Sequence, residues 1–194
     1  MPPTNPSRRR ALTDAAIELL ASSGVHGLTH RAVEKRAGLP PGTASNYFRS
    51  REALLVAAAE RIVELHHADT DRINREHQAA RDVGLAELLT RSLLTAATTA
   101  RDRYLAIFEL QLEAVRRPAL AAALAGLQDA AVRLTAGRHG ELGIAVPRER
   151  IPALIALYGG ALFTLVTAPP GVAGEAFARQ LAQAIVDGCG APGS

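Results

Sequence analysis

Apolar side chains recur along the chain at the spacing of amphipathic helices. Near the start, Leu12, Ala16, Leu19 and Leu20 follow the i, i+4, i+7, i+8 pattern of one helix face. Gly24 is expected to end that helix. Nowhere do four or more β-branched or aromatic residues alternate with polar ones, as they would in half-buried strands. The pattern therefore predicts an all-α fold.

Two short helices are expected after this first one. The Thr29 side chain can cap the first of them, and Gly38 closes it. The second is predicted to run from Pro41 to Phe48, with Pro40 and Pro41 at its first turn, where a missing N–H costs little. The glycine between the two permits a tight turn, so the pair has the pattern of a helix-turn-helix.

Longer helices are expected in the rest of the chain, the first of them capped by Ser50. Their apolar stripes are Leu55, Ala58, Ile62 and Leu65; Leu85, Leu88 and Leu89; Leu105, Phe108, Leu112 and Val115; Leu120, Leu124, Leu127 and Leu134; and Phe177, Leu181 and Ile185. Residues 151–174 carry no charge, but Gly159-Gly160 and Pro169-Pro170 interrupt this stretch. A buried helix over 153–168 is therefore favoured over a membrane span.

The predicted helix-turn-helix lies in the most informative segment, LTHRAVEKRAGLPPGTASNYFRSREALL, residues 28–55. Its second helix exposes small or hydrogen-bonding residues, which let a helix enter a DNA groove, and Asn46 can pair with adenine through two hydrogen bonds. Basic residues surround it: Arg31, Lys35, Arg36, Arg49 and Arg51. They suit contacts to phosphates. The alternative is an ordinary helical hairpin with a solvated basic face.

The charge distribution supports DNA binding. The formal net charge is +3, and residues 1–53 hold eight basic and four acidic side chains, whereas the other 141 residues hold 14 and 15. All of the positive excess therefore lies in the N-terminal quarter. Arg8, Arg9 and Arg10 have the wrong sign for a helix N-terminus. They are expected either to form a solvated arm or to meet DNA phosphates or a minor groove.

The segment 10–63 resembles the N-terminal domain of the tetracycline-repressor (TetR) family of transcriptional regulators. The resemblance rests on AAIELLASSGVHGLTHRAVEKRAGL followed by PPGTASNYFRSREALL, with the aromatic pair Tyr47-Phe48 and the helix start Ser50–Leu55. It implies a DNA-binding domain over 1–53 and a helical effector-binding and dimerisation domain over 54–194. It also implies a homodimer, a palindromic double-stranded operator, and an effector that lowers DNA affinity, so the expected function is a repressor acting in the cytoplasm.

The resemblance also assigns roles to single residues. Thr29 falls where the family caps its second helix and touches a phosphate, Tyr47 where a tyrosine commonly binds a phosphate, and Arg51 where a lysine commonly does. Phe48, Leu19 and Val33 are expected in the domain core. With His30 added as a DNA-facing side chain, the candidate DNA contacts are Thr29, His30, Arg31, Pro41, Gly42, Thr43, Ser45, Asn46, Tyr47 and Arg51.

Catalytic and metal chemistry have little support in the sequence. It has no G-x-S-x-G, P-loop, H-E-x-x-H or C-x-x-C motif, and Cys189 is its only cysteine. No catalytic residue, metal ligand or cofactor is therefore expected. The start of the chain has no apolar segment of the secretory type. Two alternatives stay open, an architectural DNA-binding protein without an effector and a small all-α enzyme.

Two further sets of residues are candidates in the C-terminal part. The last two apolar helices are expected to form the dimer interface, with burial in the protomer's own core as the alternative; the interface candidates are Gly159, Leu162, Phe177, Leu181 and Ile185. The effector candidates are Thr95, Tyr104, Phe108, Glu109 and Tyr158. Three tyrosines, four phenylalanines and no tryptophan predict a mostly aliphatic cavity for a largely apolar effector. Glu109, on an apolar helix, is expected either to face solvent or to meet a ligand donor or an arginine.

Overall fold

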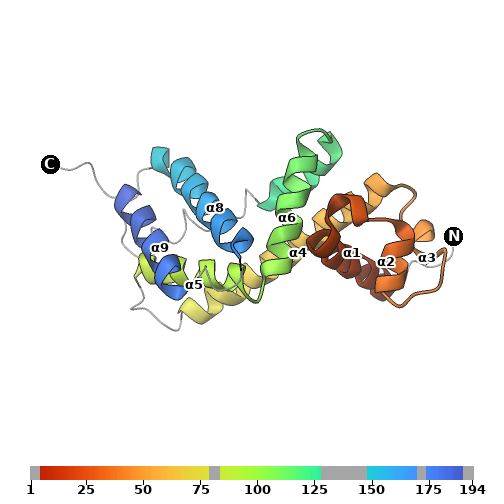
Figure 1. Ribbon diagram of the computed structural model, residues 1–194, viewed down its shortest axis with the longest axis horizontal. Coiled ribbons are helices and arrows are strands. Elements are labelled where there is room, and N and C mark those ends of the chain that lie inside the picture. Colours follow the sequence, from red (N-terminus) through yellow and green to blue (C-terminus); the bar gives the residue numbers. More distant parts are fainter. Residues whose placement is uncertain (1–4, 79–83, 128–147, 170–173, 190–194) are drawn as a thin grey trace. The chain divides into compact units, whose positions relative to one another are not determined.

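A computed structural model describes residues 5–78, 84–127, 148–169 and 174–189. The described residues form helices and connecting turns, without a strand, so the all-α prediction is confirmed (Figure 1). The helices are α1 (Pro6–Gly27), α2 (His30–Arg36), α3 (Thr43–Tyr47), α4 (Arg51–Gln78), α5 (Leu85–Ala97), α6 (Arg101–Ala114), α8 (Ile151–Thr167) and α9 (Glu175–Cys189). The short 3₁₀ turn η1 (Arg148–Arg150) precedes α8, and residues 118–127 are also helical.

Most of the predicted helix ends agree with the structure. Gly24 has φ 63° and ψ −176°, a conformation almost confined to glycine, so regular helix breaks there before one more turn to Gly27. The Thr29 side chain accepts a hydrogen bond from the Ala32 N–H at 3.1 Å and caps α2. Ser50 Oγ accepts from the Ala53 N–H at 3.1 Å in the same way, at the start of α4.

The predicted start of the third helix was wrong. Pro40 and Pro41 lie before α3 and not in its first turn, because Gly42 has a left-handed φ of 84° that interrupts helical geometry. The Thr43 hydroxyl donates a hydrogen bond to the Pro40 carbonyl at 2.6 Å, which closes this turn. The helix therefore begins at Thr43 and has only five residues.

The chain divides into two compact units. The first contains residues 1–68 and 102–127, and the second contains residues 69–101 and 128–194. The division by compactness thus differs from the predicted functional boundary after residue 53, because α6 and the 118–127 helix belong with the N-terminal helices. Where the DNA-binding and effector-binding functions divide stays a prediction.

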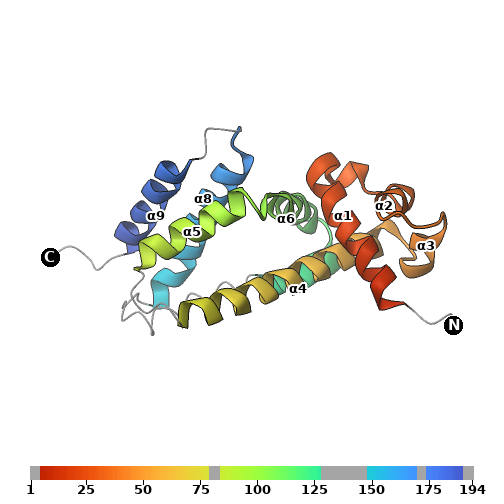
Figure 2. The ribbon, with the colours of Figure 1, turned by 90° about the horizontal axis from the view of Figure 1, so that it is seen from below.

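In the first unit, α1, α2 and α3 surround the beginning of α4 (Figure 2). Its core contains Leu19, Val33 and Phe48, as predicted, together with residues from α4 and α6. The largest fully buried side chains of this core are Leu12, Leu20, Leu28, Val33, Leu54, Leu55, Ile62, Leu110 and Leu120. Burial of this apolar surface holds α6 against the three N-terminal helices.

In the second unit, α5, α8 and α9 pack against one another. Leu93, Leu165 and Val166 are almost completely buried there. No helix in the described ranges is long and apolar enough to cross a membrane, although α8 has no charged residue. The predicted helix over 153–168 corresponds to α8, whereas Leu134 lies outside the described residues.

Candidate nucleic-acid interface

The exposed face of α3 carries the predicted base-reading residues. Ser45 and Asn46 are exposed, as are Pro41 and Gly42 in the turn before the helix, and Thr43 is half-buried. Ala44, on the opposite side of the helix, is completely buried in the core of the first unit. The helix therefore packs through Ala44 and leaves a small, polar face open to a partner.

A buried carboxylate that sequence reasoning missed supports the start of α3. Glu34 of α2 is only 5% exposed, and its Oε1 accepts a hydrogen bond from the Ala44 N–H at 2.7 Å. Gly42, the residue before α3, has no side chain that could do this. A glycine at this position was the available signal, because the first N–H groups of a helix need acceptors from elsewhere.

Two candidate contacts are engaged inside the domain. His30 Nε2 lies 2.8 Å from the Phe48 carbonyl oxygen, which joins α2 to the end of α3. The Arg51 guanidinium donates from Nε to the Leu28 carbonyl at 3.1 Å and from another nitrogen to the Val25 carbonyl. Arg51 therefore binds the turn between α1 and α2, an arrangement that the expectation of a phosphate contact did not include.

Tyr47 is bound to the start of α1. Its hydroxyl accepts a hydrogen bond from the Asn5 N–H at 3.1 Å and donates to the Asn5 carbonyl at 3.3 Å. The Asn5 side chain in turn caps α1 by accepting from the Ser7 and Arg8 N–H groups. The residue predicted to meet a phosphate thus also fixes the first turn of α1 beside α3.

The cations of this region fall into two groups. Arg9 pairs with Glu60 at 3.3 Å and lies 5.7 Å from the centre of the Phe48 ring, and Arg36 pairs with Glu18 at 3.3 Å. The other group is exposed and makes no ion pair with any residue in the described ranges; it consists of Arg8, Arg10, Arg31, Lys35 and Arg49. These are the charges available to phosphates.

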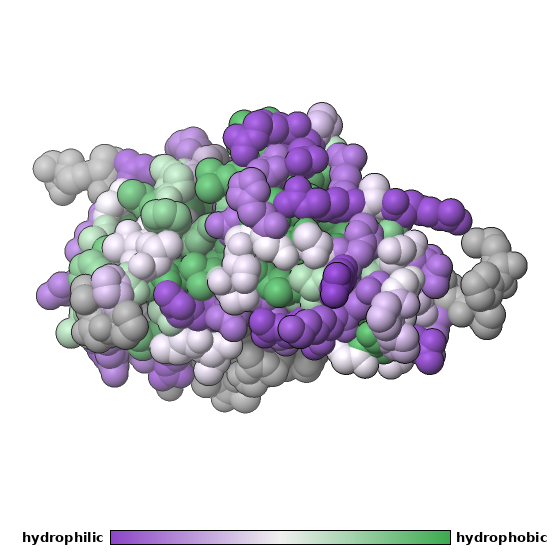
Figure 3. Space-filling view, turned by 45° about the vertical axis from the view of Figure 1, so that its right-hand side comes forward, coloured by the Kyte–Doolittle hydropathy of each residue, from purple (hydrophilic) through white to green (hydrophobic). Residues whose placement is uncertain are grey.

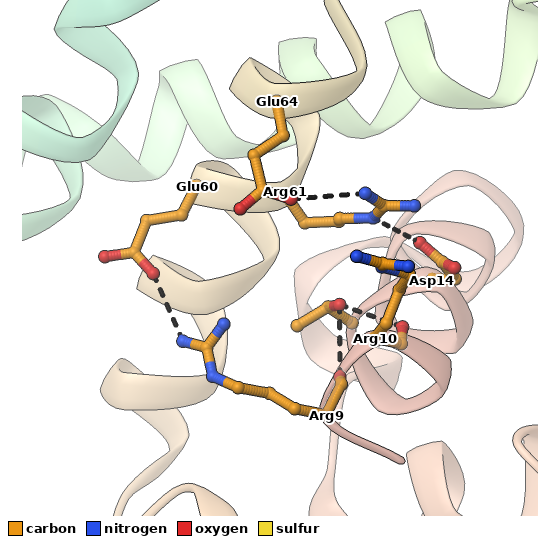
Figure 4. A network of polar contacts seen from close by, with 7 residues as sticks. Arg9, Arg10, Asp14, Glu60, Arg61 and Glu64 are labelled. Carbon is orange, nitrogen blue, oxygen red and sulfur yellow. Dashed lines mark hydrogen bonds and ion pairs between the residues drawn. The ribbon is translucent and has the colours of Figure 1, made fainter. Parts of the chain in front are cut away.

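A charged network joins α1 to α4 (Figure 4). Arg61 donates to Asp14 at 2.7 Å and to Glu64 at 3.1 Å. The hydrogen bond with Asp14 raises the pKa of the half-buried Arg61 above its ordinary value. Arg10 lies near this network, where its carbonyl accepts a hydrogen bond from the Thr13 hydroxyl at 2.9 Å and its guanidinium has no bond drawn to it in Figure 4. The network fixes α1 on α4 and leaves the exposed face of α3 free.

Comparison with known families identifies the family to which this chain belongs. Residues 12–58 match the model of bacterial regulatory proteins of the tetR family, and residues 80–189 match the tetracyclin repressor-like C-terminal domain. The chain belongs to the TetR family. This family consists of DNA-binding transcriptional regulators and not of enzymes.

Individual TetR-family proteins are similar to this chain in sequence and in structure. The transcriptional regulator BetI of Escherichia coli is 32% identical over 83 residues, which is 42% of this chain and 43% of BetI, so the match spans less than half of that relative. The crystal structure of the multidrug binding protein EbrR complexed with ethidium is 30% identical, with a TM-score of 0.67, over 92% of this chain and 98% of that one. A TetR-family member from Streptomyces coelicolor A3 is also 30% identical, with a TM-score of 0.69, over 93% and 98% of the two chains.

The five effector candidates of this TetR-family chain lie in different surroundings. Tyr104 and Phe108 of α6 pack, partly buried, against the core of the first unit. Tyr158 of α8 is hydrogen-bonded to Ser92 of α5 in the second unit, where Thr95 is exposed. Glu109 of α6 accepts a hydrogen bond from the Val25 N–H at 3.0 Å, a partner that neither predicted alternative included. Their role toward an effector stays a prediction.

The interface candidates differ in exposure. Leu162 and Ile185 are buried in the second unit's own core, at 8% and 4% exposure. Phe177 is exposed, Gly159 and Leu181 are half-buried, and a Cβ added at Gly159 would meet nothing within 4 Å. On the face drawn in Figure 3, hydrophobic residues are exposed among hydrophilic ones, mainly in the left and central parts of the view. Leu157 and Phe163 of α8 add large exposed apolar side chains at 50% and 53% exposure.

Proposed function

We propose that this protein represses a target gene by binding a palindromic DNA operator as a homodimer, and that a largely apolar small molecule releases it. The observation that carries the proposal is α3, whose exposed face holds Ser45 and Asn46 while Glu34 and Ala44 fix its position. Short polar side chains on such a helix can reach base edges in the major groove. The protein would act in the cytoplasm, where the operator is.

The exposed cations support binding to the DNA backbone. Arg31 at the start of α2 and Arg49 between α3 and α4 both lie close in sequence to the recognition elements, and neither makes an ion pair with a described residue. Phosphate contacts from such residues give affinity and register without reading bases. The preference for particular bases would then come from α3.

Recovery of the DNA that the full-length protein retains from fragmented genomic DNA, followed by footprinting, tests the operator proposal. A dimer with two recognition helices in successive major grooves requires half-sites with centres about 34–36 Å apart, or a multiple of this. A palindromic footprint with that period is expected. Protection without dyad symmetry, or uniform binding to all fragments as an architectural protein would give, contradicts the proposal.

The effector proposal draws on composition and on a relative. The chain is rich in aliphatic and poor in aromatic residues, which suits a ligand held mainly by apolar contact. Crystal structures of EbrR hold ethidium and proflavin. Both compounds are planar aromatic cations, so we include a cationic group in the proposed effector class.

Thermal shift without DNA tests this ligand class, because ethidium and proflavin also bind DNA directly. Binding stabilises the folded protein in proportion to the logarithm of ligand concentration over Kd. Apolar cations are expected to raise the Tm, and those that do should release the operator fragment. Release by strongly polar anions alone contradicts the proposed class, and chemical turnover of the bound compound would support an enzyme instead.

We place the dimer interface on α8 and α9. Large apolar side chains exposed on a protomer mark a surface that a partner covers, and α8 exposes Leu157 and Phe163 while α9 exposes Phe177. A two-fold interface would bring this surface against its own copy.

Leu157→Glu combined with Phe163→Glu is expected to convert the dimer into a monomer at micromolar concentration, because four carboxylates would be buried across the two-fold axis. Sedimentation velocity measures the change. Val115→Glu is the control, since Val115 is 83% exposed but lies outside α8 and α9. A double variant that stays dimeric, or a control that becomes monomeric, places the interface elsewhere.

A further inference from the structure

One hydrogen bond joins α6 to the end of α1 across 84 positions of sequence. Glu109 Oε2 accepts from the Val25 N–H at 3.0 Å, immediately after the break at Gly24. A Cβ on Gly24 would lie only 3.1 Å from the same oxygen, so the carboxylate also lies directly against the backbone. A side chain at position 24 would crowd the carboxylate and strain the backbone, whose φ of 63° favours glycine.

Val25 is also bound by α4, through its carbonyl oxygen. The Val25 carbonyl accepts from Arg51, and Arg51 also donates to the Leu28 carbonyl. Hydrogen bonds to charged groups are shorter and stronger than neutral ones. The turn between α1 and α2 is thus fixed by a carboxylate from α6 and a guanidinium from α4.

This turn leads into α2, which is bound to the DNA-reading helix α3. After Leu28, the chain enters α2 at His30, and α2 is joined to α3 by His30 to the Phe48 carbonyl and by Glu34 to the Ala44 N–H. Each of these contacts lies within the first unit. The position of the turn therefore sets the position of α2 and, through it, of α3.

We infer that Glu109 is a positioning residue for operator binding: its carboxylate, bound to the Val25 N–H, holds the α1–α2 turn in the geometry that presents α3 to DNA. The inference rests on the proposed operator binding. Glu109 would act without touching DNA or the effector. Its Oε2 joins α6 directly to the end of α1, from which the chain turns into α2.

The direction of the change in operator affinity distinguishes a positioning role for Glu109 from no role. Removing a carboxylate from a DNA-binding domain reduces repulsion from the phosphates, so loss of an idle surface glutamate should leave affinity unchanged or raise it. Loss of Glu109 is expected to lower it. Glu113 is the matched control, because it lies one turn later on α6 and, among the described residues, binds only Arg116 and Arg117, its near neighbours in sequence.

The test compares Glu109→Ala, Glu109→Gln and Glu113→Ala in the full chain, with the DNA fragment that the wild type selects as probe. Glu109→Ala is expected to weaken operator binding about tenfold at every salt concentration, with an unchanged salt dependence, because no phosphate contact is lost. Glu109→Gln keeps an oxygen acceptor and should therefore lose less operator affinity than Glu109→Ala. Glu113→Ala should bind as the wild type does.

Amide hydrogen exchange at Val25, measured by NMR, reports the contact itself. In Glu109→Ala the Val25 amide should exchange at least several-fold faster, while amides in the middle of α1 keep their protection. An unchanged Val25 amide, or a faster amide with unchanged operator affinity, overturns the inference. If Glu109→Ala does not fold, the same two readouts on Glu109→Gln decide. A wild type that selects no DNA refutes the proposed function instead, and the Val25 amide still shows whether the contact exists.

Discussion

Glu34→Ala is expected to reduce operator affinity by about 100-fold or more, which corresponds to about 2.7 kcal/mol. The Glu34 carboxylate is buried and accepts from the Ala44 N–H at 2.7 Å. Alanine would leave that N–H buried without an acceptor, at a cost of about 1–3 kcal/mol. A five-residue helix cannot absorb this loss by other contacts, so α3 would shift or unwind. Fluorescence anisotropy with the selected operator fragment measures the affinity.

Glu18→Ala is the matched control for Glu34→Ala. Glu18 is also an acidic residue of the first unit, but its side chain is 53% exposed and pairs with Arg36 at the surface. Exposed pairs of this kind contribute about 0–1 kcal/mol, so affinity should change less than threefold. Glu34→Gln, which keeps an acceptor oxygen, should fall between the two. Equal affinities for Glu34→Ala and Glu18→Ala would mean that Glu34 does not support α3.

Arg51→Ala is expected to lower the free energy of unfolding by about 2–4 kcal/mol, in addition to weakening operator binding. Its guanidinium donates to the carbonyls of Val25 and Leu28, and a hydrogen bond to a charged group contributes about 1.5–3 kcal/mol. Removing it takes the Arg51 donor from the Leu28 carbonyl and leaves the Val25 carbonyl with the Leu28 N–H, which lies 3.1 Å away. Urea denaturation, which gives the free energy in water by linear extrapolation, measures the stability loss.

Arg49→Ala separates the two roles of arginine in this region. Arg49 is exposed and binds no described carboxylate, so its removal should leave stability within about 0.5 kcal/mol of the wild type. If Arg49 contacts a phosphate, operator affinity should fall and the salt dependence should decrease by about one counterion. A stable Arg51→Ala whose only defect is this same salt effect would restore the simple phosphate role for Arg51.

The features that depend on local sequence could be predicted well. Thr29 and Ser50 cap the helices that they were expected to cap, because a cap depends on a side chain and the N–H groups two or three residues later. The core positions of Leu19 and Val33 followed from helical periodicity, and that of Phe48 followed from the family resemblance. The exposure of Ser45 and Asn46 followed from the same pattern, together with the family resemblance.

The contacts that could not be predicted join residues far apart in sequence. Glu109 and Val25 are 84 positions apart, and Tyr47 and Asn5 are 42 apart, so no periodicity connects them. A buried acceptor for α3 could have been suspected from Gly42, but which carboxylate supplies it depends on how α2 packs. Arg51 was assigned by position to a phosphate, and only the folded turn brings the Val25 and Leu28 carbonyls within its reach.

Sequence-specific reading of DNA by α3 is the central claim, and competition between single-base operator variants tests it most directly. Wild type and Asn46→Ala are compared against every base substitution in the selected half-site. Asn46→Ala is expected to lose its preference at one base pair per half-site, with a discrimination cost of about 1–3 kcal/mol, and to keep the others. An Asn46→Ala protein whose base preferences equal those of the wild type at every position would contradict the claim.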